Sequence, residues 1–257
     1  YEHMPLFGMK LVVTRPRDLI SQMAAKLRRL GAEVLELPAI STEAITPNDA
    51  LDKAMDSLDT YQWLVFTSPT GVKVFFKALR AHGKDIRALG TVKIASIGKG
   101  TSRELEKLGL YADLMPDVFD GEHLGEALYE AAAEHDRILI PRAEIGNHEL
   151  IDALQKGKAL TVTDVPTYTT VYTKEQVVDQ EKLFGEKDNV MAVFTSASTV
   201  RGFASACPDL DFTKVKAACI GKQTQAEAAK LGMTTYVSKE ASMDSLVELI
   251  CETAAAR

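Results

Sequence analysis

Two short polar motifs each occur twice in the sequence, and both carry groups that could bind an anion. Phe-Thr-Ser stands at 66–68 and 194–196, and Ile-Gly-Lys-X-Thr at 97–101 and 220–224. Each motif follows a strand-like apolar run and precedes a helix-like segment, so its hydroxyls and the free N–H groups of a helix start could bind carboxylates or phosphates. Ordinary helix capping is the alternative for any single copy. A P-loop is excluded, because Lys93 stands where its first glycine is needed.

One tyrosine breaks an otherwise matched pair of segments. Leu-Pro-Ala-Ile at 37–40 corresponds to Val-Pro-Thr-Tyr at 165–168, so Tyr168 stands where the first copy has Ile40. A phenol with an ordinary pKa near ~10 stays protonated at neutral pH and can donate a proton to a leaving oxygen. A half-exposed strand tyrosine without a chemical role is the alternative. The sequence offers little competing chemistry, because it has no Gly-X-Ser-X-Gly elbow and its five histidines lack metal-ligand spacing.

These motifs belong to a repeat that spans most of the chain. Arg15, in Val-Thr-Arg-Pro, matches Arg142, in Ile-Pro-Arg-Ala, 127 residues later. The Phe-Thr-Ser copies, with Ser68 and Ser196, are 128 residues apart. The last motif supplies two further matched pairs at an offset of 123, which are Lys99 with Lys222 and Thr101 with Thr224. Several matches in one order predict an internal duplication.

Strand-like and helix-like segments alternate along the chain, which is typical of a parallel sheet covered by helices. Strands are expected at 10–14, 34–38, 63–67 and 92–97, and helices at 20–30, 69–82 and 101–108. The sequence therefore predicts an α/β fold of two similar lobes, each a parallel sheet flanked by helices. The extended segments at 37–42 and 165–170 could be linker strands that join exchanged lobes. Periodicity alone does not distinguish this exchange from a simple tandem.

Composition limits the classes of function. The chain has 257 residues, 46% hydrophobic and 26% charged, as expected of a globular protein with a full core. A net charge of −6 argues against non-specific nucleic-acid binding. No apolar run approaches the ~20 residues that span a bilayer, and residues 1–4 do not resemble a signal peptide. Three cysteines without a CxxC spacing favour a reduced, cytoplasmic setting with neither disulfides nor zinc.

Together the motifs resemble the uroporphyrinogen-III synthase family of tetrapyrrole (haem and sirohaem) biosynthesis, over about residues 10–250. The resemblance implies two α/β lobes joined by a two-stranded β linker, with the active site in a cleft between them. One lobe would combine 1–38 with 172–257, and the other would be the inserted 39–171. It also implies a cofactor-independent carbon–oxygen lyase without metal. The enzyme would close linear hydroxymethylbilane to uroporphyrinogen III, with loss of water and inversion of ring D.

The same resemblance implies roles for individual residues. Tyr168 would donate to the departing hydroxyl, and the hydroxyls lining the cleft would belong to Ser68, Thr101, Ser196 and Thr224. The expected carboxylate partners are Arg15, Arg142, Lys99 and Lys222. A cytoplasmic monomer is expected, with hydroxymethylbilane as substrate and transient contact with hydroxymethylbilane synthase, and with neither nucleic acid nor membrane as partner. The alternative, from a different class, is a non-catalytic two-lobed binding module for a small anionic metabolite.

Overall fold

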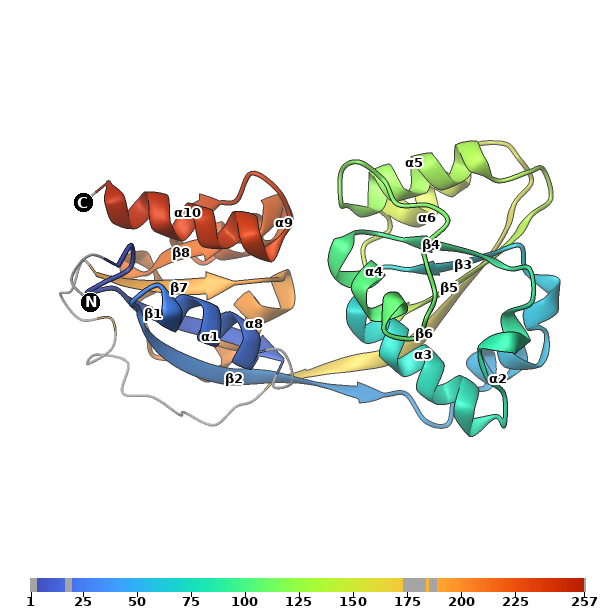
Figure 1. Ribbon diagram of the computed structural model, residues 1–257, viewed down its shortest axis with the longest axis horizontal. Helices are drawn as coiled ribbons and strands as arrows, with labels where there is room; N and C mark the ends of the chain where they lie inside the picture. The colour runs from blue at the N-terminus through green and yellow to red at the C-terminus, as the bar shows by residue number, and fades with distance from the viewer. Residues whose placement is uncertain (1–3, 17–19, 173–183, 185–188, 257) are drawn as a thin grey trace. The chain divides into compact units, whose positions relative to one another are not determined.

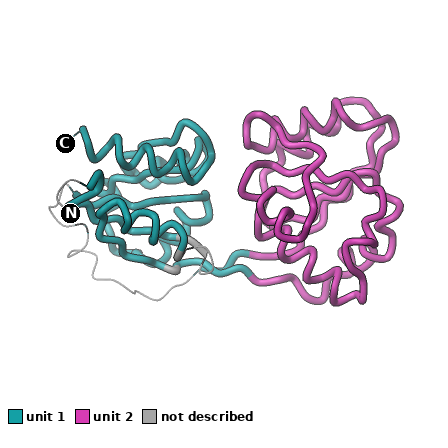
Figure 2. The backbone as a smooth tube through the Cα atoms, in the orientation of Figure 1, with its two compact units in different colours: residues 1–42, 170–257 teal, residues 43–169 magenta. Residues whose placement is uncertain are grey.

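The computed structural model describes residues 4–16, 20–172, 184 and 189–256. It divides into two compact units, which Figure 2 shows in different colours. Unit 1 consists of 1–42 and 170–257, and unit 2 of 43–169. The domains expected from the sequence, 1–38 with 172–257 and 39–171, remain a prediction, because compactness alone does not show that either unit folds by itself.

Unit 2 is built on parallel strands in the order β4-β3-β5-β6. Their bounds are Trp63–Phe66 (β3), Lys93–Ser96 (β4), Arg137–Ala143 (β5) and Thr161–Tyr172 (β6), the last running three residues beyond the unit. The helices are Asp49–Asp56 (α2), Pro69–Ala81 (α3), Lys99–Glu106 (α4), Gly121–Ala131 (α5) and Glu149–Leu154 (α6), with 3₁₀ turns at Leu58–Thr60 and Ile86–Leu89. Figure 1 shows these elements with their labels.

Alternation along the strands separates two cores in unit 2. Leu64 and Phe66 of β3 pack under α2, α3 and α4, whereas Trp63 and Val65 pack under α5 and α6. Each strand is therefore apolar on both faces, as expected of a parallel sheet covered by helices on both sides. This confirms the predicted fold class.

Unit 1 contains parallel strands in the order β2-β1-β7-β8-β9. The strands are Lys10–Pro16 (β1), Glu33–Ala44 (β2), Val190–Phe194 (β7), Lys216–Cys219 (β8) and Thr234–Val237 (β9). The helices are Ile20–Arg29 (α1), Ala197–Ala206 (α8), Gly221–Lys230 (α9) and Met243–Ala255 (α10), with a 3₁₀ turn at Phe212–Lys214. Residues of α8 and α9 pack in one core, and those of α1 and α10 in the other.

The two units are built from corresponding elements, but these elements follow one another along the chain in a different order in each unit. The run β3-α3-β4-α4 corresponds to β7-α8-β8-α9, and β5-α6-β6 corresponds to β1-α1-β2. Residues 10–14 of β1 pair in parallel with 190–194 of β7, so the first strand completes the sheet of the last third of the chain. The exchanged arrangement is therefore present rather than a simple tandem, and β2 and β6, neighbours in the strand order, carry the chain between the units. A common origin by duplication stays a prediction.

Within the described ranges, no helix is long and apolar enough to cross a membrane.

Candidate functional site

Both Phe-Thr-Ser motifs end a buried strand and begin a helix. Ser68 has extended backbone and caps α3, where its Oγ accepts a hydrogen bond of 2.9 Å from the N–H of Gly71. Ser196 caps α8 in the same way, accepting from the N–H of Thr199 at 3.2 Å. Capping, the simpler explanation of these serines, is therefore correct. Each serine hydroxyl also has a second partner, and these partners differ between the units.

The two motifs of each unit lie side by side at the carboxyl edge of its sheet. The N–H of Ile97 donates to the carbonyl of Phe66 at 3.0 Å, and the N–H of Ile220 donates to the carbonyl of Phe194 at the same distance. The starts of the paired helices are thereby held next to each other, because each motif leads directly into its helix. Parallel α/β sheets bind ligands at this edge, and helix starts there favour anions.

Tyr168 is the second partner of Ser68. The phenol oxygen lies 2.8 Å from Ser68 Oγ, and the residue is only 6% exposed. Burial raises the pKa of Tyr168 above its ordinary value of 10.0, and the hydrogen bond with Ser68 offsets part of that rise. The phenol is therefore neutral at physiological pH and retains a proton to donate.

Arg142 is the most constrained of the predicted cations. It is buried and forms a two-pronged ion pair with Asp164, with Nε–Oδ1 and Nη2–Oδ2 distances of 2.8 Å. Its Nη1 donates to the carbonyl of Asn147 at 2.6 Å. The guanidinium is already paired with a carboxylate of the protein, and it ties β5 to β6 and to the 144–148 loop.

The other predicted cations are less constrained. Lys99 is exposed, and its ammonium lies 5.6 Å from the ring centroid of Phe119. Lys222 is exposed in the first turn of α9. Arg15 lies in β1, but its side chain falls outside the described set. Lys99 and Lys222 each lie in the first turn of the helix that an Ile-Gly-Lys-X-Thr motif begins.

The predicted threonines take equivalent positions. Thr101 lies in the first turn of α4 and Thr224 in that of α9, and both are almost fully buried. Neither hydrogen bonds to Ser68 or Ser196. Tyr168 and Ser68 are thus the one pair of predicted site side chains joined by a hydrogen bond within the described residues.

Unit 1 carries a buried hydroxyl that sequence reasoning missed. Thr14 is 0% exposed, and its Oγ1 has no hydrogen-bond partner among the described residues. It pairs with Phe194, the last residue of β7, and points to the same face as Val12, which packs with residues of α8. An unsatisfied buried hydroxyl is costly and rare. Its place in the Val-Thr-Arg-Pro motif was the available signal.

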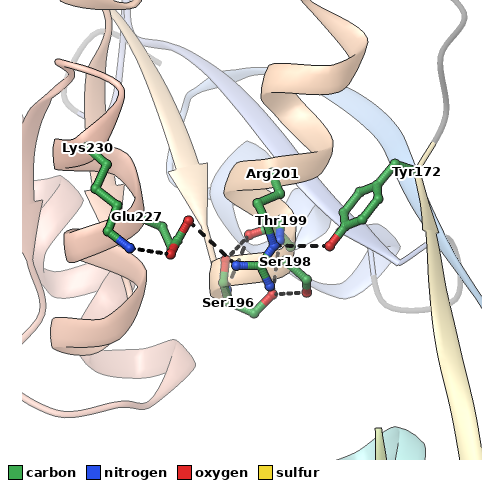
Figure 3. A network of polar contacts seen from close by, with 7 residues as sticks. All are labelled: Tyr172, Ser196, Ser198, Thr199, Arg201, Glu227 and Lys230. Atoms are coloured by element: carbon green, nitrogen blue, oxygen red, sulfur yellow. Dashed lines mark hydrogen bonds and ion pairs between the residues drawn. The ribbon is translucent and has the colours of Figure 1, made fainter. Parts of the chain in front are cut away.

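Polar side chains next to Ser196 form a second group that sequence reasoning missed (Figure 3). Ser196 Oγ lies 2.9 Å from Ser198 Oγ. Arg201 donates from Nε to the phenol oxygen of Tyr172 at 3.1 Å and lies 3.5 Å from Glu227. Glu227 also pairs with Lys230 at 3.0 Å. In unit 2, Glu104 and Lys107 form the ion pair that corresponds to Glu227 with Lys230.

In the part of the chain that the structure describes, no group of three or more His, Cys, Asp or Glu side chains could hold an ion. The expected absence of a metal stays a prediction.

Fold and site together define a two-unit parallel α/β protein with paired helix starts at the carboxyl edge of each sheet, one of each pair capped by a serine hydroxyl. The chain belongs to the uroporphyrinogen-III synthase family, since the family model described as Uroporphyrinogen-III synthase HemD matches residues 21–248. This confirms the resemblance seen in the sequence.

Individual relatives agree with this assignment. The chain is 34% identical over 248 residues to the porphyrin biosynthesis protein HemD of Ruminiclostridium josui, and the match covers 96% of this chain and 49% of that protein. It thus spans about half the length of that relative. It is 29% identical over 252 residues to the uroporphyrinogen-III synthase of Synechococcus elongatus, covering 95% of this chain and 94% of the relative.

Solved structures show the same fold. A mutant uroporphyrinogen III synthase from Thermus thermophilus superposes with a TM-score of 0.63 at 19% identity, covering 97% of this chain and 99% of that one. The enzyme from Helicobacter pylori gives a TM-score of 0.64 at 16% identity, covering 97% and 100%. At these identities the likeness concerns the fold alone.

Proposed function

We propose that this chain closes linear hydroxymethylbilane to uroporphyrinogen III, with inversion of ring D and loss of one water. Family membership supports the reaction. The hydrogen bond of 2.8 Å between Tyr168 and Ser68 is the structural observation that carries the proposal. It places a neutral, buried phenol beside a helix start suited to an anionic substrate.

The reaction needs little from the protein beyond proton donation and control of substrate shape. Electrons of the ring A pyrrole nitrogen expel the hydroxyl, and Tyr168 supplies the proton with which it leaves as water. A phenol is a far stronger acid than water, whose pKa is about 15.7, so a raised pKa does not prevent this transfer. Ring D then attacks through its substituted carbon, and a spiro intermediate rearranges. A proton finally leaves the joined ring carbon, which balances the one that Tyr168 gave.

The eight substrate carboxylates would be held locally rather than by overall charge. The chain has a net charge of −6, so binding would depend on helix-start N–H groups and nearby hydroxyls. We assign this role to Ser68, Thr101, Ser196 and Thr224, with Lys99, Lys222 and Arg15 as additional partners. Arg142 would need to retain Asp164 or exchange it for a substrate carboxylate, and its ion pair favours retention.

Product analysis tests the proposal directly. Freshly prepared hydroxymethylbilane is incubated with the protein, and the uroporphyrinogen isomers are separated after oxidation. Buffer alone gives the spontaneous symmetric isomer I. Isomer III above that background is expected. Isomer I at the buffer rate would overturn the proposal, and binding without conversion would support the non-catalytic anion-binding module instead.

The proposal extends to the class of the reaction, its independence of cofactors and the working state of the protein. We place the reaction among the hydro-lyases, with no metal or organic cofactor, so prior dialysis against a chelator should leave the rate of isomer III formation unchanged. A cytoplasmic monomer in transient contact with hydroxymethylbilane synthase is the proposed working state. Sedimentation of the protein alone, and then mixed with that synthase, checks both parts of it.

A further inference from the structure

The strand that carries Tyr168 has one residue too many for regular pairing. Ile140 pairs with Asp164, and the next two pairs along β5 and β6 are regular. After Arg142, which pairs with Pro166, Ala143 pairs with Tyr168 rather than with Thr167. One step on β5 thus matches two on β6, which makes Thr167 the extra residue of a β-bulge.

This bulge decides which face of the sheet Tyr168 occupies. Val165 packs in the core under α3, whereas Val162 packs on the opposite core under α5 and α6. Strict alternation from Val165 would place Thr167 on the α3 face and Tyr168 on the other. Tyr168 instead reaches Ser68 at the start of α3. The extra residue has moved the phenol across the sheet, as a slip of one residue must.

Thr167 is held by hydrogen bonds on both sides. Its hydroxyl donates to the carbonyl of Arg142 at 3.1 Å, and its own carbonyl accepts from the N–H of Ile45 at 3.0 Å. The side chain is 0% exposed. Next to it, the N–H of Glu144 donates to the carbonyl of Tyr168 at 2.8 Å. The Thr167 hydroxyl therefore bonds the extra residue of β6 directly to the carbonyl of Arg142 on β5, next to the irregular step.

The same irregularity exists in unit 1, where no phenol follows it. Thr14 pairs with Leu37 and Pro16 with Ile40, so β2 also has one extra residue. Ile40 is buried, and its Cγ2 lies against Gly202 of α8. The bulge is thus a feature of both units, whereas a bulge hydroxyl belongs to unit 2, because Ala39 stands where unit 2 has Thr167.

We propose that Thr167 is a positioning residue for the reaction, whose hydroxyl, bonded to the carbonyl of Arg142, holds the backbone before Tyr168 so that the phenol stays directed toward Ser68. The inference rests on the proposed function of Tyr168. Thr167 would orient Tyr168 without touching the substrate, because the threonine is fully buried.

Paired substitutions test this role. Thr167→Val keeps the shape of the side chain and removes the hydroxyl, whereas Thr167→Ser keeps the hydroxyl. We expect Thr167→Val to lower kcat for isomer III by about 10- to 100-fold with KM changed little, because small misplacement of a reacting group has that effect. Thr167→Ser should restore most of the rate. Thr163→Val, the same change earlier on β6, serves as the matched control and should behave as the unmodified protein.

Combination with Tyr168→Phe separates positioning from general destabilisation. If Thr167 acts through the phenol, Thr167→Val should lower the rate of isomer III no further in the Tyr168→Phe background. An equal loss in both backgrounds, wild-type kcat in Thr167→Val, or equal loss in Thr167→Val and Thr167→Ser would each overturn the proposal.

A second measurement keeps the inference separate from the activity. Spectrophotometric titration, taken as the difference from Tyr168→Phe, follows the ionisation of Tyr168 alone. Thr167→Val should bring that ionisation down toward pH 10, because a displaced phenol gains access to water. If the intact protein forms only isomer I, the proposed function fails. An unchanged titration in Thr167→Val would then refute the positioning role independently.

Discussion

Ser68→Ala should lower the stability of unit 2 by more than Ser196→Ala, the equivalent substitution, lowers the stability of unit 1. The equivalent serine of unit 1, Ser196, supplies the comparison. Ser68 accepts from Gly71 and also bonds the buried phenol of Tyr168. Ser196 accepts from Thr199, but its other partner is a half-buried serine hydroxyl. Ser68→Ala therefore removes a cap and orphans a buried hydroxyl, whereas Ser196→Ala mainly removes a cap.

The magnitudes follow from these contacts. A lost serine cap costs about 1 kcal/mol, which is the whole effect expected of Ser196→Ala. Orphaning the Tyr168 hydroxyl adds about 1–3 kcal/mol, so Ser68→Ala should cost about 2–4 kcal/mol. In the Tyr168→Phe background no hydroxyl is left to orphan. There Ser68→Ala should cost about 1 kcal/mol, and the difference between the two backgrounds is the coupling energy of the pair.

Urea unfolding measures these differences. Trp63 is the single tryptophan of the chain and is buried in β3, so its fluorescence follows unit 2. Far-UV circular dichroism follows the Ser196→Ala variant. Equal costs for Ser68→Ala and Ser196→Ala, together with a coupling energy near zero, would refute the hydrogen bond between Ser68 and Tyr168 in solution.

Three further outcomes are expected. Tyr168→Phe should reduce isomer III formation by about 100-fold or more, because a proton donor is lost. The unfolding midpoint should change little, because Ser68 still accepts the hydrogen bond from Gly71. Unchanged turnover would remove Tyr168 from the mechanism. Asp164→Asn should lower the free energy of unfolding by about 2 kcal/mol in urea titrations, since Arg142 is left buried without its carboxylate; a change near zero would contradict this. Burial raises the pKa of Cys219 from 9.0 to about 12, so the unfolded thiol ionises first and stability falls as pH rises from 9 to 12. Between pH 8 and pH 10 the protein should lose about 1.4 kcal/mol more than Cys219→Ala, measured by urea unfolding at each pH.

The position of the motifs could be predicted from sequence because it depends on local signals. A Phe-Thr-Ser motif after an apolar run and before a helical pattern predicts a capped helix start, and Ser68 and Ser196 both form one. The pairing of β1 with β7 could not be predicted in this way. It joins residues 10–14 to 190–194, and period-two alternation shows which face is buried but not which strand is adjacent.

The partners of individual side chains were also beyond the sequence. Arg142 and Asp164 meet because β5 and β6 pair in a particular register, and a charge on each of two strands does not reveal that register. The contact of Tyr168 with Ser68 needed still more. Regular alternation places Tyr168 on the wrong face, and a single threonine at a bulge has no sequence pattern of its own.

The equivalent strands of the two units show what is particular to the one that carries the phenol. Both units have a bulge at the equivalent place, and both direct the residue after it toward the helix that a Phe-Thr-Ser motif starts. In unit 1 this residue is Ile40, which packs against Gly202. In unit 2 it is Tyr168, which bonds Ser68. The bulge therefore does not depend on the phenol, because it forms before an aliphatic residue in unit 1 as well as before Tyr168 in unit 2. Unit 2 differs in having the hydroxyl of Thr167 next to the phenol. The substitutions at Thr167 and those at Ser68 therefore test the same property, which is the orientation of Tyr168.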